Sequence, residues 1–172
     1  MDISVILTSA RFGGLDVLWD SMRRQTFKGE FEVIISDEFY KERQHWVNSL
    51  WRSNFSFIHL PPKRECRPYD DSLGINTALA AASGELVVVL ADYTWAPPDY
   101  LQAHWDFHKA NPGWSMSCYL DRYPLPPIKA EPYSIERDWW SVFQSDFSPS
   151  WFDGKEPIYK ERRASIGKVN EE

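Results

Sequence analysis

Polar side chains with ligand-binding chemistry follow three apolar runs of the sequence, at the point where each run ends. They are Thr8, Ser9 and Arg11 after residues 3–7, Asp37 and Glu38 after residues 31–35, and Asp92 after residues 86–90. Carboxylates accept hydrogen bonds from N–H and O–H groups, and hydroxyl and guanidinium groups can contact phosphate. This set predicts a nucleotide site in which Asp37 accepts the N–H of a base and Asp92 holds ribose hydroxyls.

A nucleotide site also needs positive charge opposite its phosphates. Basic candidates lie in the Pro-rich segment at residues 61–69, and they are Lys63, Arg64 and Arg67. A divalent cation is the alternative, because either kind of charge can neutralise a diphosphate. The chain carries neither G-x-G-x-x-G nor G-x-x-x-x-G-K-[ST], so neither a dinucleotide-binding loop nor a P-loop is predicted.

Strand patterns alternate with helix patterns along the first part of the chain. Strands are expected at residues 3–7, 31–35, 55–60 and 86–90, and helices at residues 15–24, 41–50, 70–82 and 99–111. Such alternation predicts an α/β fold with a mostly parallel central sheet flanked by helices. Ligands bind at the carboxyl ends of the strands in such sheets, so Asp37 and Asp92 are expected to meet at the same edge of the sheet.

Two local patterns add detail to this prediction. Five consecutive apolar residues at 86–90 indicate a central strand that is covered on both faces. Ser83 and Gly84 precede this strand and are expected to end the helix before it, with Gly84 as a left-handed cap.

The composition is that of one soluble domain. The chain has 172 residues, and its formal net charge of −6 disfavours tight binding to a nucleic-acid backbone. Cys66 and Cys118 form neither a disulfide framework nor a zinc motif, which favours a cytoplasmic location. No segment approaches the roughly 20 apolar residues that cross a bilayer, so no transmembrane segment is expected.

The order and spacing of the motifs resemble family 2 glycosyltransferases of the GT-A fold, over about residues 2–120. Similar segments are S-V-I-L-T-S-A-R at residues 4–11 and E-V-I-I-S-D-E at residues 32–38. Single matching positions are Leu15, Leu18, Ser21, Gln25, Thr26, Asn76, Leu79, Ala82, Gly84 and Glu85. The resemblance implies a GT-A-like, Rossmann-like fold and adds Asn76 to the nucleotide-binding residues.

The same resemblance implies a reaction and a division of the chain. Residues 1–120 would bind a nucleoside-diphosphate sugar, such as a UDP-sugar, and residues 121–172 would form an irregular segment of the same domain on the acceptor side. The implied activity is an inverting transfer of the sugar to an acceptor hydroxyl on a glycan, lipid, protein or nucleic acid.

The chain departs from the family at its metal-binding motif. The family's D-x-D falls on Ala91-Asp92-Tyr93, and Ile75 stands where the family has an arginine. The resemblance implies Mn²⁺ or Mg²⁺ at Asp92, held also by diphosphate oxygens and water. Because both flanking acids are missing, a catalytically inactive GT-A-like module that binds a nucleotide or a partner is the alternative function.

The catalytic base is left open between two positions. The family's base is an acid beyond a segment that residues 162–172 loosely match, which would put the base past the end of a truncated chain. Glu136 or Asp138 is the alternative. Either acid would deprotonate the acceptor hydroxyl, a contribution of roughly 10² to 10⁴ in rate.

Overall fold

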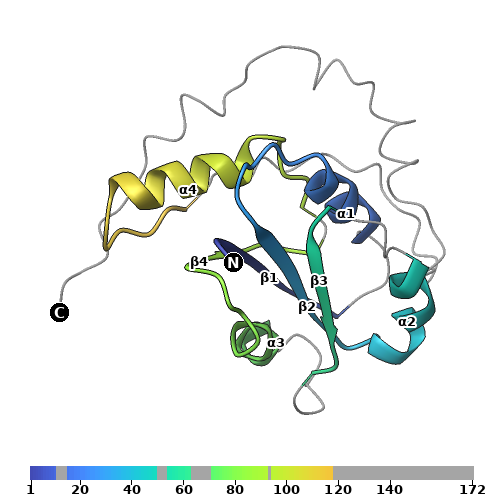
Figure 1. Cartoon of the computed structure of the whole chain (residues 1–172). Helices are drawn as coiled ribbons and strands as arrows, with labels where there is room; N and C mark the ends of the chain where they lie inside the picture. The colour runs from blue at the N-terminus through green and yellow to red at the C-terminus, as the bar shows by residue number, and fades with distance from the viewer. Residues whose placement is uncertain (11–14, 50–53, 63–70, 93, 118–172) are drawn as a thin grey trace, which may run out of the picture.

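A computed structural model describes residues 1–10, 15–49, 54–62, 71–92 and 94–117 (Figure 1). Strands and helices alternate along this part of the chain, as predicted. The elements are β1 (Ile3–Ser9), α1 (Leu15–Arg23), β2 (Phe31–Asp37), α2 (Tyr40–Ser49), β3 (Ser56–Leu60), α3 (Asp71–Leu79), β4 (Leu86–Val89) and α4 (Tyr100–Ala110). No helix among these is long and apolar enough to cross a membrane.

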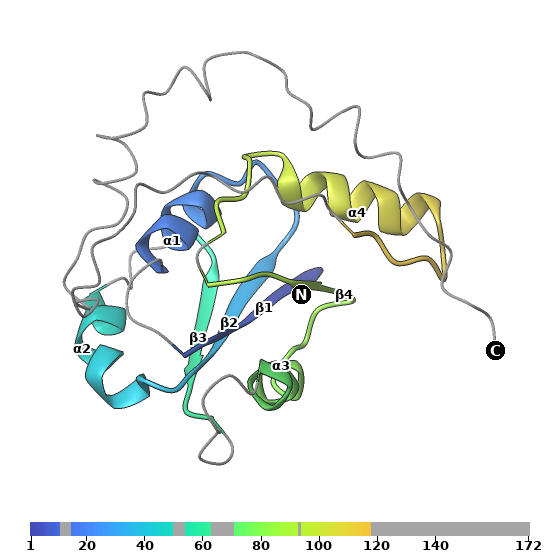
Figure 2. The same cartoon turned by 180° about the vertical axis from the view of Figure 1, so that it is seen from behind.

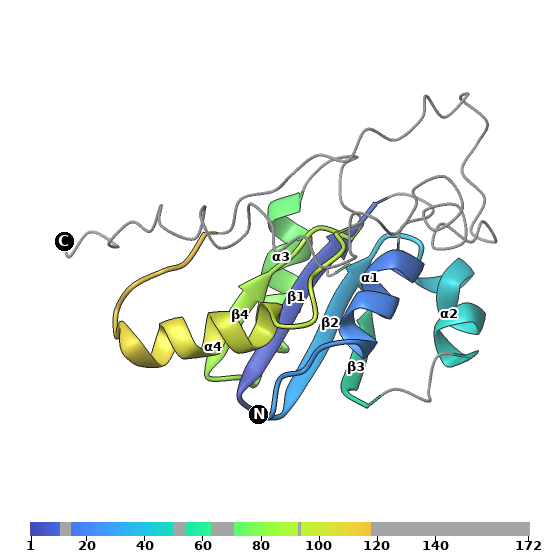
Figure 3. The ribbon, with the colours of Figure 1, turned by 90° about the horizontal axis from the view of Figure 1, so that it is seen from above.

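The four strands form one sheet in the order β3-β2-β1-β4, and every neighbouring pair is parallel (Figure 3). Consecutive parallel strands need a crossover connection, and here each crossover contains a helix. The prediction of an α/β fold with a mostly parallel sheet flanked by helices is therefore confirmed.

Helices cover both faces of the sheet, with α1 and α4 on one side and α3 on the other (Figures 1 and 2). The first face carries the larger apolar core, in which Val5 and Val33 pack with Leu18 of α1 and Leu101 of α4. The opposite face carries a smaller core around Ala78 of α3. Because side chains alternate along a strand, this division decides which strand-end residues share a face.

β1 and β2 continue past their apolar runs into polar residues. The register of the pair places Thr8 beside Ser36 and Ser9 beside Asp37. Ser9 and Asp37 follow the odd-numbered residues of their strands, so they lie on the face that α1 and α4 cover. Two of the predicted site residues are thus neighbours at the carboxyl edge of the sheet.

Two local predictions were wrong. Within the described part of the chain β4 lies at an edge of the sheet rather than in its centre, and Val89 is 57% exposed. An apolar run indicates burial, but it does not determine how many strands pair with it. The helix before β4 ends at Leu79, and Gly84 lacks the positive φ of a left-handed cap. Gly84 is needed for close approach instead, because an added Cβ would lie 2.4 Å from the backbone nitrogen of Ser4.

A second polar cluster lies at the amino end of the sheet. The Ser4 hydroxyl donates to Oε1 of Glu32 at 2.6 Å, and the hydroxyl and backbone N–H of Ser83 donate to the same oxygen. Burial alone would raise the pKa of Glu32, but these three hydrogen bonds outweigh it and lower the pKa below its usual value. The cluster fastens the segment before β4 to β1 and β2.

Candidate functional site

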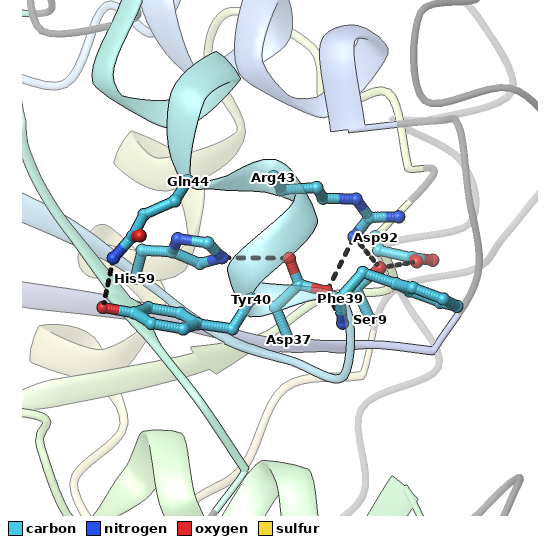
Figure 4. A network of polar contacts seen from close by, with 8 residues as sticks. All are labelled: Ser9, Asp37, Phe39, Tyr40, Arg43, Gln44, His59 and Asp92. Carbon is cyan, nitrogen blue, oxygen red and sulfur yellow. Dashed lines mark hydrogen bonds and ion pairs between the residues drawn. The ribbon is translucent and has the colours of Figure 1, made fainter.

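A buried network of polar side chains lies at the carboxyl edge of the sheet, centred on Asp37 (Figure 4). Oδ1 of Asp37 accepts hydrogen bonds from a terminal guanidinium nitrogen of Arg43 and from the backbone N–H of Phe39, both at 2.9 Å. Oδ2 lies 2.9 Å from Nε2 of His59. Both carboxylate oxygens of Asp37 are therefore bonded within the protein.

The network extends from Asp37 to Asp92 through two side chains. The guanidinium nitrogen that contacts Asp37 also donates to Oγ of Ser9 at 2.8 Å. The Ser9 hydroxyl in turn donates to Oδ2 of Asp92 at 2.7 Å. Asp37 and Asp92 are 55 positions apart (92 − 37) in the sequence, and a chain of three hydrogen bonds joins them. The predicted meeting of Asp37 and Asp92 at one edge of the sheet is confirmed.

Arg43 and His59 reach the network from neighbouring elements. Arg43 lies on the buried side of α2, one turn before Val47, and its guanidinium stands 5.4 Å from the centre of the Phe39 ring. His59 extends from β3, where the Tyr40 ring packs against it at 4.6 Å between centroids. Gln44 donates to the Tyr40 hydroxyl at 3.1 Å and fixes that ring (Figure 4).

The network is shielded from water and carries charge of both signs. The side chains of Asp37 and Arg43 are 0% and 2% exposed, and Asp92 is 5% exposed. Buried charges are stable only when they are paired and hydrogen-bonded. The guanidinium of Arg43 balances the charge of Asp37. It also donates to Ser9, whose hydroxyl donates to Asp92.

The structure places Thr8 and Asn76 on the opposite face of the sheet and Glu38 beside the network. Thr8 points to the opposite face, where its hydroxyl lies so close to α3 that a Cβ at Gly74 would be 2.1 Å from Oγ1. Asn76 is an exposed residue of α3, on that same face. Glu38 is half-buried at the edge, and its backbone N–H donates to the carbonyl of Ser9 at 2.9 Å. Their roles as nucleotide ligands stay predictions.

Several predicted site residues lie outside the described residues. They are Arg11, Lys63, Arg64, Arg67, Glu136 and Asp138. The division at residue 120 also lies outside them, so the phosphate contacts, the catalytic base and the acceptor segment stay predictions.

Sequence reasoning missed Arg43 and His59. The sequence holds only a weak signal for each of them, which the packing of the elements makes clear. Arg43 lies four residues before the buried Val47, on the stripe of α2 that faces inward, and His59 alternates with Phe57 along β3. Some ionisable residues lie on the buried side of a helix or strand next to the carboxyl edge of the sheet. Such residues are candidate partners for the acids at that edge.

Asp92 is the candidate for a divalent cation, and the described residues fit such an ion poorly. Mg²⁺ and Mn²⁺ prefer several oxygen ligands, with one or two carboxylates among them. Oδ2 of Asp92 accepts the Ser9 hydroxyl, and the second carboxylate of the network is bonded to Arg43 and His59. In the described part of the chain, no three His, Cys, Asp or Glu side chains form a group that could hold a metal.

Comparison with known proteins gives a likeness of fold. No protein-family model matches the sequence, and no curated protein matches it. The chain is similar to solved structures of TarS from S. aureus. The structure of TarS 1-349 has 22% identity, a TM-score of 0.47, and covers 64% of this chain and 33% of that one. Its complex with UDP-GlcNAc has 20% identity and a TM-score of 0.47, and covers 64% and 32%.

A third similar structure is TarS 1-349 in complex with UDP, with 22% identity and a TM-score of 0.47, covering 64% of this chain and 32% of that one. The chain thus spans about a third of the length of these structures. The likeness concerns the fold alone.

Proposed function

We propose that this chain is the nucleotide-sugar-binding part of a glycosyltransferase that transfers a sugar from a nucleoside-diphosphate sugar to an acceptor hydroxyl. The observation that supports this most strongly is the link between Asp37 and Asp92 through Arg43 and Ser9. In an open parallel sheet, the carboxyl edge is where ligands bind. Two acids that reach this edge from separate strands provide acceptors for a base N–H and for ribose hydroxyls.

The proposed contacts require one rearrangement. Asp37 is 0% exposed, so a base can reach its carboxylate only if side chains that cover it move, and Oδ2, which is bonded to His59, can then accept a second hydrogen bond. Asp92 would hold the ribose hydroxyls. Lys63, Arg64 and Arg67 would stand opposite the diphosphate, where bidentate guanidinium contacts are strong.

The proposed reaction inverts the anomeric carbon. A carboxylate, Glu136 or Asp138 or an acid beyond this chain, takes the proton of the acceptor hydroxyl. The acceptor oxygen forms its bond to the anomeric carbon while the bond from that carbon to the diphosphate oxygen breaks, and the nucleoside diphosphate leaves with that electron pair. Positive groups that stabilise the leaving diphosphate supply a large share of the rate.

A catalytically inactive module that binds a nucleotide or a partner is the second candidate. The observation that favours it is the burial of Asp37, whose carboxylate is 0% exposed and is already bonded to Arg43 and His59. Leu90 and Ala91, which precede Asp92, supply no further acid to the edge.

Thermal unfolding with a panel of nucleotides tests the binding part of this proposal. A ligand at 100 times its Kd stabilises the folded state by about 2.7 kcal/mol, so UDP, GDP or a related sugar nucleotide should raise the Tm of the wild type. Asp92→Asn should lose most of this rise. The matched control is Asp106→Asn on α4, whose exposed carboxylate accepts a hydrogen bond from Gln102 and should leave the rise unchanged.

A turnover assay separates the two candidates. Release of the nucleoside diphosphate from the sugar nucleotide that binds best, measured with and without simple acceptors, supports the transferase. Binding without release supports the inactive module. A protein whose Tm responds to no nucleotide contradicts the transferase and leaves the inactive module that binds a partner.

A further inference from the structure

The guanidinium of Arg43 stands between the two carboxylates of the strand-end network (Figure 4). One of its nitrogens donates to Asp37 and to Ser9, and Ser9 donates to Asp92. We propose that Arg43 takes the place of a divalent cation at this edge, so that the site binds its ligand without metal. The inference rests on the proposed function only in treating this edge as the ligand-binding edge.

Two buried carboxylates, Asp37 at the end of β2 and Asp92 after β4, lie on either side of β1 and are stabilised by a cation between them. Like charges in a water-excluded site disfavour each other's ionised form, and a bridging positive charge removes that penalty. In oxygen-rich sites a divalent cation commonly has this task. Here the task falls to Arg43, which is 2% exposed and contacts one carboxylate directly and the other through a single hydroxyl.

Arg43 is held in this position by the elements around it. It projects from the buried side of α2, and Val47 one turn later is buried on the same side. Its guanidinium also stands over the ring of Phe39 at 5.4 Å, and the backbone N–H of Phe39 donates to Asp37. The cation is therefore part of the fold and is present whatever ligand binds.

A divalent cation added to this arrangement would meet an unfavourable charge. The guanidinium of Arg43 already places a positive charge between the two carboxylates. Guanidinium and metal together would place three positive charges on two carboxylates. Asp92 is also flanked in sequence by Ala91 and Tyr93, which add no carboxylate.

Removal of the guanidinium should convert the edge into a metal site. Arg43→Ala leaves Asp37, Asp92 and His59 around the vacated space. The expected result is a variant with a lower Tm in EDTA that regains part of the loss in millimolar Mn²⁺, by at least about 4 °C. The wild type should have the same Tm in EDTA and in Mn²⁺.

Two further variants identify the site of any metal effect. Arg43→Lys keeps a cation on α2 and should remain insensitive to Mn²⁺, like the wild type. Arg43→Ala combined with Asp92→Asn removes one of the metal's carboxylates and should lose the regain. A Mn²⁺-dependent rise in the Tm of the wild type that Asp92→Asn abolishes would overturn the proposal, as would an Arg43→Ala variant that folds and shows no response to Mn²⁺.

A binding measurement on the wild type decides the matter if Arg43→Ala does not fold. Titration calorimetry with the nucleotide that binds best should give the same Kd in EDTA and in Mn²⁺. A Kd that is measurable only with Mn²⁺ refutes the role of Arg43 and leaves the proposed function standing. If no nucleotide binds in either condition, the proposed function fails, and the Mn²⁺ titration of the wild type and Asp92→Asn still tests Arg43.

Discussion

Arg43 and Asp37 form a 2.9 Å ion pair in which neither side chain is more than 2% exposed. Such a pair differs from a surface ion pair, because loss of one partner strands the other as an uncompensated buried charge. The sequence offers a direct comparison, since Arg24 and Asp20 form an exposed pair one turn apart at the end of α1.

Arg43→Met should destabilise the fold by about 3–5 kcal/mol, and Asp37→Asn should have a cost of similar size. The double variant should cost clearly less than the two single changes together, because neither charge is then left unpaired. Arg24→Met, the surface control, should cost less than about 1 kcal/mol. Urea unfolding followed by tryptophan fluorescence measures all four, and additive costs for the buried pair would contradict this account.

Glu32 should make the free energy of unfolding depend on pH. Its pKa is lower in the folded state than in the unfolded chain, so the folded state gains stability above the unfolded pKa of about 4.3. This gain is lost as the pH falls through the lower, folded pKa. The free energy of unfolding of the wild type should therefore fall steeply below about pH 4.

The control for Glu32 is Glu32→Gln, which cannot ionise. At neutral pH it should be less stable than the wild type by about 1.5–3 kcal/mol, the range for hydrogen bonds to a charged group. The gap between the two should close as the pH falls. A gap that stays constant from neutral to acid pH would assign the stabilisation to packing rather than to the charge.

Two glycines should respond differently to alanine. Gly84→Ala places a Cβ 2.4 Å from a backbone nitrogen and 2.7 Å from a backbone carbon, and backbone atoms cannot turn aside. The expected cost is about 1–3 kcal/mol, as for overpacking. Gly113 has open space around it but a φ of 79°, so its alanine variant should cost only about 1 kcal/mol. Equal Tm losses would count against the close approach at Gly84.

Gln25 should stabilise the fold by holding the segment that follows Asp92 through hydrogen bonds to its backbone. Its amide donates to the carbonyl of Pro97 at 2.7 Å and accepts the N–H of Leu101 at 3.0 Å. Gln25→Ala leaves these buried groups unpaired and should cost about 1–3 kcal/mol. Thr26→Val removes only an exposed hydrogen bond to Pro98 and should cost less than about 1 kcal/mol. Chemical denaturation compares the two, and a smaller loss for Gln25→Ala would argue against this role.

The sequence predicted the parallel sheet and helices that position the site, because these elements follow from local patterns. Apolar β-branched runs mark the strands, and their alternation with helices requires a parallel sheet. The convergence of Ser9, Asp37 and Asp92 then follows from the geometry of such a sheet.

The sequence did not predict what surrounds those acids. A charged residue on a short helix is usually exposed, and only the packing of α2 beside β3 turns Arg43 inward. His59 depends in the same way on the pairing of β3 with β2. The edge position of β4 is likewise a property of the assembled sheet, because the run at residues 86–90 carries no information about its neighbours.

The hydrogen bond between Ser9 and Asp92 spans 83 positions of the chain. During synthesis Ser9 and Asp37 leave the ribosome well before Asp92. The network is therefore incomplete until β4 has paired with β1 and Asp92 lies beside Ser9. Such long-range pairings form late and slowly in folding. On the proposed function, a chain in which β4 has not yet docked should therefore bind its nucleotide weakly, so binding at this edge would report that β4 is in place.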